Sequence, residues 1–284
     1  MTDIKDFDCD FENKWCPGCG NFNILAAMKD ALAGLGMPPE SVLIVSGIGQ
    51  AGKTPHFLKC NFIHGLHGRA LPVATGAKLA NHKLTVLVSS GDGDCYGEGG
   101  NHFLAAVRRN IDITLLTHDN KVYGLTKGQS SPTSDMGFVT RMQRKGVISE
   151  PFNPLSVALT LGAGFVARGF SGEKKHLAGL IQAAINHKGF SLVNILQPCV
   201  SFNHINTNGW YKKRVADIMD TGHDPSDWDA AMALSREWGD RIPTGILYQT
   251  EGTSFTDRID HLKDGPLVDR QYDAEAVQTM LTGV

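Results

Sequence analysis

Short, continuous apolar runs separated by segments of helical periodicity constrain the fold of this chain more than any other feature. The runs lie at 41–46, 84–90, 112–118, 165–170 and 191–196. Unbroken apolar strands are typical of a parallel sheet covered on both faces, and strands that alternate with helices indicate a doubly wound α/β fold. We therefore predict a doubly wound parallel sheet in a domain at 21–204, preceded by an N-terminal arm at 1–20 and followed by an irregular C-terminal extension at 205–284.

Charge and hydropathy argue against two classes of partner. The 284 residues carry a net charge of −2, so we expect no nucleic-acid partner. No apolar run approaches the roughly 20 residues that span a bilayer, so we expect no membrane association. The first ten residues are polar and acidic and lack the basic and apolar regions of a signal peptide, from which we expect a cytoplasmic protein.

Polar residues directly follow two neighbouring predicted strands. Asp92, between Gly91 and Gly93, follows one strand, and Asn120 follows the next. Ligands collect at the carboxyl ends of strands in such sheets. A carboxylate, an amide oxygen and the Val122 carbonyl would suit Mg²⁺ and leave coordination positions for diphosphate oxygens, while the glycines let the backbone come close. From these residues alone, a plain glycine turn remains the alternative.

Cysteines form a second candidate site. Cys16 and Cys19 have the C-x₂-C spacing, and Cys60 and Cys199 lie on segments that follow predicted strands, so four thiolates could converge. Four thiolates suit a [4Fe–4S] cluster or zinc alike. A thioredoxin-type motif is a further alternative, although such a motif should follow a strand and a polar arm precedes Cys16.

The wider sequence around these motifs resembles a known family. The Gly-Asp-Gly motif is followed by Asn120, 28 positions after Asp92, and this spacing matches the thiamine diphosphate-binding motif. The surrounding sequence is similar to the β subunit of 2-oxoacid:ferredoxin oxidoreductases, particularly the 2-oxoglutarate type, at 90–94, 99–103, 108–112 and 123–133. The resemblance implies a thiamine diphosphate-binding fold. It also implies CoA-dependent oxidative decarboxylation of 2-oxoglutarate to succinyl-CoA and CO₂, with electrons passing through a [4Fe–4S] cluster to ferredoxin, in a reversible reaction.

The same resemblance implies roles for individual residues. Asp92, Asn120 and the Val122 carbonyl would bind Mg²⁺. His67 would be an active-site residue, and Lys53 resembles a basic residue that meets the distal carboxylate of the substrate, which favours a dicarboxylic 2-oxoacid. The residues that would surround the cofactor are Gly49, His67, Gly91, Gly93, Asp94, Asn120, Gly124, Leu125 and Thr126, with Leu125 toward the thiazolium and the substrate.

The cluster ligands implied by the resemblance are Cys16, Cys19, Cys60 and Cys199. One position departs from the family pattern, because the cysteine that usually follows Gly-Ile-Gly directly is Gln50 in this chain. We predict that Cys60, ten residues further on, replaces it, in preference to Cys9 or a ligand that is not a cysteine.

Thiamine enzymes of this kind need a second module that supplies an activating glutamate. The sequence contains only the diphosphate-binding module, so the resemblance implies an α subunit that carries this glutamate and the coenzyme A site, in an αβ or α₂β₂ assembly with ferredoxin as electron partner. A pyruvate or broad-range 2-oxoacid:ferredoxin oxidoreductase is the alternative, followed by a non-redox thiamine enzyme or a zinc-binding module.

Overall fold

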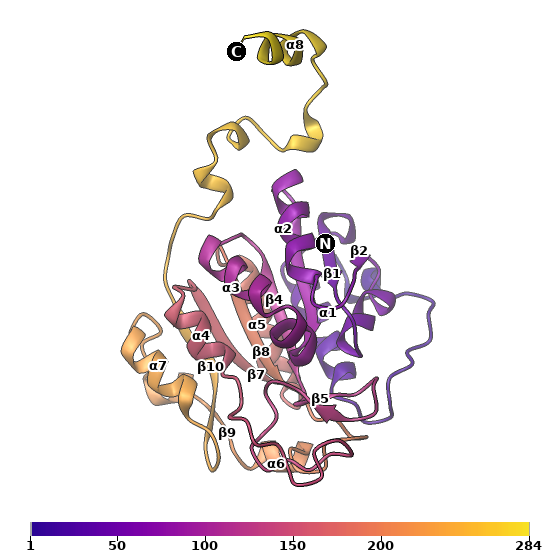
Figure 1. Ribbon diagram of the computed structural model, residues 1–284, viewed down its shortest axis with the longest axis vertical. Helices are drawn as coiled ribbons and strands as arrows, with labels where there is room; N and C mark the ends of the chain where they lie inside the picture. Colours follow the sequence, from indigo (N-terminus) through magenta and orange to yellow (C-terminus); the bar gives the residue numbers. More distant parts are fainter. Residues whose placement is uncertain (1, 284) are drawn as a thin grey trace.

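The computed structural model describes residues 2–283, and one eight-stranded sheet forms its centre (Figure 1). The strand order is β2-β1-β3-β4-β8-β7-β10-β9. Within this sheet all neighbours are parallel except β7 and β10. Parallel neighbours need crossover connections, and helices supply them on both faces of the sheet. The predicted doubly wound α/β fold is confirmed.

The elements are short. The strands of the main sheet are β1 (Val42–Ser46), β2 (Asn61–His64), β3 (Thr85–Gly91), β4 (Thr114–Asp119), β7 (Phe165–Phe170), β8 (Ser191–Leu196), β9 (Val215–Asp217) and β10 (Ile242–Gln249). A small hairpin consists of β5 (Val122–Tyr123) and β6 (Gln129–Ser130). The helices are α1 (Asn21–Gly34), α2 (Ala70–Ala80), α3 (Gly100–Arg109), α4 (Pro154–Thr160), α5 (Lys174–Asn186), α6 (Asn208–Lys212), α7 (Trp228–Arg236) and α8 (Ala274–Thr282).

Two hydrophobic cores cover the two faces of the sheet. In β1, Leu43 and Val45 belong to one core, and Val42 and Ile44 belong to the other. Helices α2, α3, α4 and α7 complete the first core, whereas α1 and α5 complete the second. Because both faces are buried, each central strand reads as an unbroken apolar run in the sequence.

The structure differs from the sequence analysis where the strand pattern is weak. The apolar-run criterion misses β2, an edge strand whose four residues are all exposed. The sheet also continues beyond residue 204, because β9 and β10 extend it within the segment predicted as an irregular extension. Pro243 and Gly245 interrupt the β10 pattern, and both residue types weaken a strand signal. The outer limits of the predicted arm and extension, residues 1 and 284, lie outside the described residues.

The end of the chain leaves the body of the molecule. Figure 1 shows the yellow segment extending away from the sheet and ending in α8. The apolar side chains of α8 are exposed, with Met280 at 78% and Leu281 at 71%. None of the helices in residues 2–283 has the length and apolar character needed to cross a membrane.

Candidate active site

Four parallel strands of the sheet end at one edge, and the segments that follow them form the site. β1 leads into 47–50, β3 into Asp92, β4 into Asn120, and β8 into 197–202. β3 pairs with β4 in parallel, with Gly91 opposite His118, so Asp92 and Asn120 follow adjacent strand ends. This is the edge at which doubly wound sheets bind ligands.

A cavity of about 110 Å³ opens at this edge. Its lining contains every residue for which the sequence analysis predicts a role in binding Mg²⁺ or thiamine diphosphate, namely Gly49, His67, Gly91, Asp92, Gly93, Asp94, Asn120, Val122, Gly124, Leu125 and Thr126. Among the described lining residues there is no lysine or arginine. A diphosphate in this cavity would therefore need a bound cation to offset its charge.

Two glycines give the cavity its shape. Gly49 has φ +100°, a backbone conformation that disfavours any residue with a side chain. At Gly93, a Cβ atom would come within 2.3 Å of the Tyr123 ring, whose hydroxyl donates to the Gly93 carbonyl at 3.3 Å. The aromatic ring thus closes one wall of the cavity, and only glycine fits opposite it.

Asp92 is the acidic group best suited to hold a cation. Its side chain is buried, and its Oδ2 accepts hydrogen bonds from Ser131 Oγ at 2.5 Å and Thr133 Oγ1 at 2.6 Å. Burial, and then the nearby carboxylate of Asp119, raise the pKa of Asp92 to about 7. No ion pair involving Asp92 occurs in residues 2–283. A buried carboxylate without a cationic partner fits a divalent-cation site.

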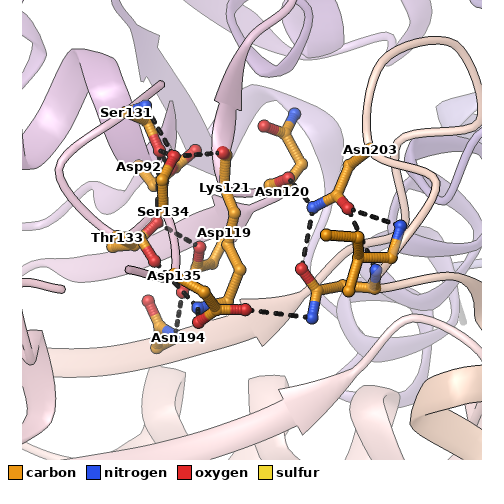
Figure 2. A network of polar contacts seen from close by, with 12 residues as sticks. Asp92, Asp119, Asn120, Lys121, Ser131, Thr133, Ser134, Asp135, Asn194 and Asn203 are labelled. Carbon is orange, nitrogen blue, oxygen red and sulfur yellow. Dashed lines mark hydrogen bonds and ion pairs between the residues drawn. The ribbon is translucent and has the colours of Figure 1, made fainter. Parts of the chain in front are cut away.

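A polar network holds the loop after β4 against the Asp92 carboxylate (Figure 2). Lys121 donates to the Thr133 carbonyl at 2.8 Å and pairs with Asp135 at 2.9 Å. Asp135 accepts from Asn206, which in turn accepts from Asn203. Asn203 also donates to the carbonyl of Asn120 at 3.3 Å. Because Thr133 also donates to Asp92, the network connects two of the three predicted Mg²⁺ ligands, Asp92 and Asn120.

Asp94 lines the cavity but is already occupied with protein contacts. Its Oδ1 accepts from the backbone N–H of Ile48 at 3.0 Å and of Gly68 at 2.8 Å, and lies 2.7 Å from His67 Nδ1. A Cβ at Gly47 would lie 2.0 Å from Asp94 Oδ2. We infer that Asp94 acts as a positioning residue that holds the segments after β1 and β2 at the cavity.

Three of the four predicted cluster ligands, Cys16, Cys19 and Cys199, line a second pocket. Cys16 Sγ accepts from Ser201 Oγ at 3.2 Å, and Cys19 Sγ accepts from Gln197 Nε2 at 3.3 Å. Burial, and to a smaller extent the thiols of Cys199 and Cys16, raise the pKa of Cys19 to about 11. A positively charged metal group would reverse this shift, because it binds thiolates.

The spacing of these thiols bears on the kind of metal group that fits. In the described part of the chain, no three His, Cys, Asp or Glu side chains are grouped closely enough to hold one metal ion. Three thiols around one pocket fit a metal group with thiolate ligands, such as an iron–sulfur cluster.

The structure does not bring Cys60 or Lys53 to these pockets. Cys60 lies before β2, packs against the second hydrophobic core, and donates to the Asn61 carbonyl at 3.3 Å. Burial raises its pKa to about 12. Lys53 lies in the 3-10 segment Ala51–Phe57, close to His56, and is absent from the residues that line the first cavity.

The two pockets share a wall made of Gln50, Asn120 and Gly124. A hydrogen-bond chain crosses it, because Asn120 Nδ2 donates to Gln197 Oε1 at 3.1 Å and Gln197 donates to Cys19. Sequence reasoning misses Gln197 as a site residue. Its position at the carboxyl end of β8, two residues before Cys199, is the signal that could have identified it.

Comparison with known proteins places the chain in a family. The family model for the thiamine pyrophosphate enzyme C-terminal TPP binding domain matches 45–195, and the model for the C-terminal part of the pyruvate ferredoxin oxidoreductase beta subunit matches 199–264. The second match covers β9 and β10, so the sequence similarity extends over the strands that the sequence analysis misses.

Curated relatives and a solved structure agree with these matches. The chain is 47% identical to the 2-oxoacid:ferredoxin oxidoreductase subunit beta of a Sulfolobus species, over 87% of this chain and 85% of that protein. It is 46% identical to the 2-oxoglutarate oxidoreductase subunit KorB of Mycobacterium tuberculosis, over 70% of this chain and 53% of that protein.

The solved structure is the 2-oxoglutarate:ferredoxin oxidoreductase from Magnetococcus marinus, with 2-oxoglutarate, coenzyme A and succinyl-CoA bound. The match has a TM-score of 0.91 at 39% identity and covers 99% of this chain and 96% of that chain. With the two pockets at the edge of the sheet, these similarities show that the chain belongs to the family of 2-oxoacid:ferredoxin oxidoreductase β subunits.

Proposed function

We propose that this chain binds thiamine diphosphate through Mg²⁺ and, with an α subunit, converts 2-oxoglutarate and coenzyme A to succinyl-CoA and CO₂, with electrons passing through an iron–sulfur cluster to ferredoxin. The observation that carries the proposal is the shared wall of Gln50, Asn120 and Gly124 between the cavity and the three-cysteine pocket. Adjacent cofactor and cluster sites suit a reaction in which electrons leave the cofactor directly.

The residues of the cavity have separate tasks in this proposal. Asp92, Asn120 and the Val122 carbonyl hold Mg²⁺, which binds the diphosphate. Thiamine diphosphate, when bound, supplies the carbanion chemistry of decarboxylation. Gly93 and Tyr123 shape the wall of the cavity, and Leu125, which is 45% exposed, covers the side toward the substrate.

His67 is the titratable side chain most available to a substrate. It lines the cavity, its side chain is 40% exposed, and its Nδ1 is oriented by Asp94 at 2.7 Å. A histidine whose Nδ1 is held by a carboxylate can present its other ring nitrogen to a ligand. We assign it the role of orienting the substrate and exchanging a proton with it.

Two observations bear on the nature of the 2-oxoacid, and they point in different directions. The Magnetococcus relative holds 2-oxoglutarate, whereas the family model for 199–264 is named for pyruvate. Lys53 lies outside the lining of the cavity, two residues after Ala51, which does line it, and we propose that its side chain meets the second carboxylate of 2-oxoglutarate from there. Reaction rates with 2-oxoglutarate and with pyruvate, measured for the wild type and for Lys53→Ala, distinguish the two substrates. Selective loss of the 2-oxoglutarate rate in Lys53→Ala supports the proposal. A wild-type rate that is faster with pyruvate than with 2-oxoglutarate contradicts it.

An α subunit is the partner that the proposal requires. The relatives are named as β subunits, which implies a second subunit. We propose that this subunit supplies the activating glutamate and the coenzyme A site, in an αβ or α₂β₂ assembly. The test is an anaerobic assay with 2-oxoglutarate, coenzyme A and a ferredoxin. Activity should appear only when both chains are present, and full turnover by this chain alone would refute the assignment.

A further inference from the structure

We propose that Gln50 takes the place of a fourth thiolate in the three-cysteine pocket, so that a cluster bound there has three thiolate ligands and one iron that faces the side-chain oxygen of Gln50. The inference deepens the proposed function and rests on it, since it assumes that the pocket lined by Cys16, Cys19 and Cys199 holds an iron–sulfur cluster.

The position of Gln50 is the first observation. Gln50 lines the three-cysteine pocket and also belongs to the wall shared with the cofactor cavity. Its backbone is held in place, because its carbonyl accepts from Trp15 Nε1 at 2.8 Å and from the N–H of Lys53 at 3.3 Å. Trp15 directly precedes Cys16, so the same contact fixes Gln50 relative to the first cysteine.

The second observation is that Gln50 Oε1 is buried and has no hydrogen-bond partner within residues 2–283. Buried polar atoms are nearly always paired, and a bound ion or a redox role is among the explanations for an unpaired one. An amide oxygen can act as a metal ligand. The unpaired atom therefore points to an electropositive group in the pocket.

The other polar residues of the pocket are already in use. Asn120 Oδ1 accepts from the Val122 N–H, Gln197 bonds to Asn120 and to Cys19, and Ser201 donates to Cys16. No fourth cysteine and no His, Asp or Glu is found among the described lining residues. Gln50 is the remaining side chain with a free oxygen.

A ligand set of this kind changes the cluster in two ways. An amide is neutral, so the cluster carries one negative charge fewer than with four thiolates, and its reduction potential rises. An amide oxygen also binds iron less firmly than a thiolate, because iron–sulfur clusters favour soft ligands. Ferricyanide would remove one electron from the [4Fe–4S]²⁺ state, and release of one Fe²⁺ would leave [3Fe–4S]⁺.

The experiment uses the complete αβ complex, purified without oxygen. Iron and sulfide are counted per β chain, and electron paramagnetic resonance spectra are recorded before and after ferricyanide. In the wild type we expect one of four irons to be lost and the signal of the three-iron cluster to appear. In Gln50→Cys we expect all four irons to remain and the reduction potential to fall. Gln182→Cys, on the distant helix α5, is the matched control and should behave as the wild type.

Cys60→Ser separates this inference from a cluster ligated by Cys60. We expect its iron content and spectrum to equal those of the wild type, and loss of iron in this variant would overturn the inference. A wild-type cluster that resists ferricyanide as well as Gln50→Cys does would overturn it too. A wild-type complex without iron would instead refute the proposed function itself. If Gln50→Cys fails to fold, the wild type and Cys60→Ser still decide.

Discussion

One hydroxyl group links two buried carboxylates at the site, those of Asp92 and Asp119. Thr133 Oγ1 lies 2.6 Å from Asp92 Oδ2 and 2.8 Å from Asp119 Oδ1. A hydroxyl has a single proton and can donate it to one of them only. Two buried carboxylates this close repel each other, which is one cause of the raised pKa of Asp92. A cation bound by Asp92 would offset the repulsion, and the bond from Thr133 would then hold the Asp92 carboxylate in place for it.

We predict that Thr133→Val weakens Mg²⁺-dependent binding of thiamine diphosphate by roughly 10- to 100-fold, as is typical for loss of a group that orients a metal ligand. Isothermal titration of the cofactor at fixed Mg²⁺ measures the change. Thr75→Val, in helix α2, removes a threonine hydroxyl that bonds only to the Leu71 carbonyl, so its affinity should equal that of the wild type. Equal affinities for all three proteins would contradict the role of Thr133.

Glycine substitutions test the shape of the cavity. In Gly93→Ala the new methyl group would collide with the Tyr123 ring, so cofactor binding should fall by at least about tenfold, equivalent to roughly 1.4 kcal/mol. The control is Gly76→Ala in helix α2, where a Cβ meets no atom within 4 Å. It should keep its cofactor affinity and gain roughly 0.5–1 kcal/mol in the free energy of unfolding. Thermal unfolding and titration of both variants check these outcomes, and unchanged binding in Gly93→Ala would count against the cavity.

For single residues, sequence analysis finds those that stand in a recognisable sequence pattern. Asp92 and Asn120 follow strands directly, and every predicted cofactor residue lines one cavity. Gln197 and Thr133 do not stand in such a pattern. Their roles depend on hydrogen bonds to Asn120 and Asp92, which lie 77 and 41 positions away in the sequence. Cys60 is predicted because it follows a predicted strand and lies ten residues after Gln50, and only its packing against the second hydrophobic core shows that it lies outside the pocket.

Among the elements, the turn that carries Cys16 and Cys19 depends on one aromatic anchor. Trp15 is buried, and its ring meets Phe22 and Phe57 edge to face at 5.6 and 4.9 Å. Its indole N–H donates to the Gln50 carbonyl. The same side chain thus attaches the N-terminal arm to helix α1 and to the segment after β1.

We predict that Trp15→Phe lowers the free energy of unfolding by about 1 kcal/mol, since it removes one hydrogen bond and keeps an aromatic ring. It should also reduce the iron bound per chain, because the cysteine turn loses its attachment. The matched control, Trp228→Phe, removes the bond to the Leu159 carbonyl on helix α4, far from the cysteines in sequence. Urea unfolding and iron analysis compare them, and an equal loss of iron in both variants would contradict the account.

Strands that are buried on both faces could be predicted from the sequence, whereas strands at the margins could not. β1, β3, β4, β7 and β8 have fully or almost fully buried residues and appear as apolar runs. β2 is exposed, β9 has three half-buried residues, and β10 contains a proline and a glycine with φ +129°. Their pairing with the sheet depends on tertiary contacts that local patterns do not encode.

In the whole molecule, the C-terminal segment is the part whose packing within the chain is weakest. Helix α8 has no buried residue, and Lys83–Asp269 is an exposed ion pair of the kind that contributes about 0–1 kcal/mol. Exposed apolar side chains on a projecting helix are typical of a surface that another chain covers.

We predict that deletion of 266–284 leaves the unfolding temperature of this chain alone unchanged but weakens its association with the α subunit. Analytical ultracentrifugation of mixtures measures the association. The full-length double variant Met280→Ser, Leu281→Ser removes the apolar contacts without shortening the chain and should show the same defect. Association as tight as that of the wild type in both proteins would show that α8 does not contribute.

The central claim is that the cofactor cavity and the three-cysteine pocket are parts of one electron path. Its most direct test is electron paramagnetic resonance of the αβ complex, frozen without oxygen after addition of 2-oxoglutarate and coenzyme A. The account predicts a reduced-cluster signal in the wild type and none in Asp92→Ala, which keeps the three cysteines but lacks the carboxylate for Mg²⁺. A cluster that stays oxidised in the wild type, or that is reduced equally in Asp92→Ala, would contradict it.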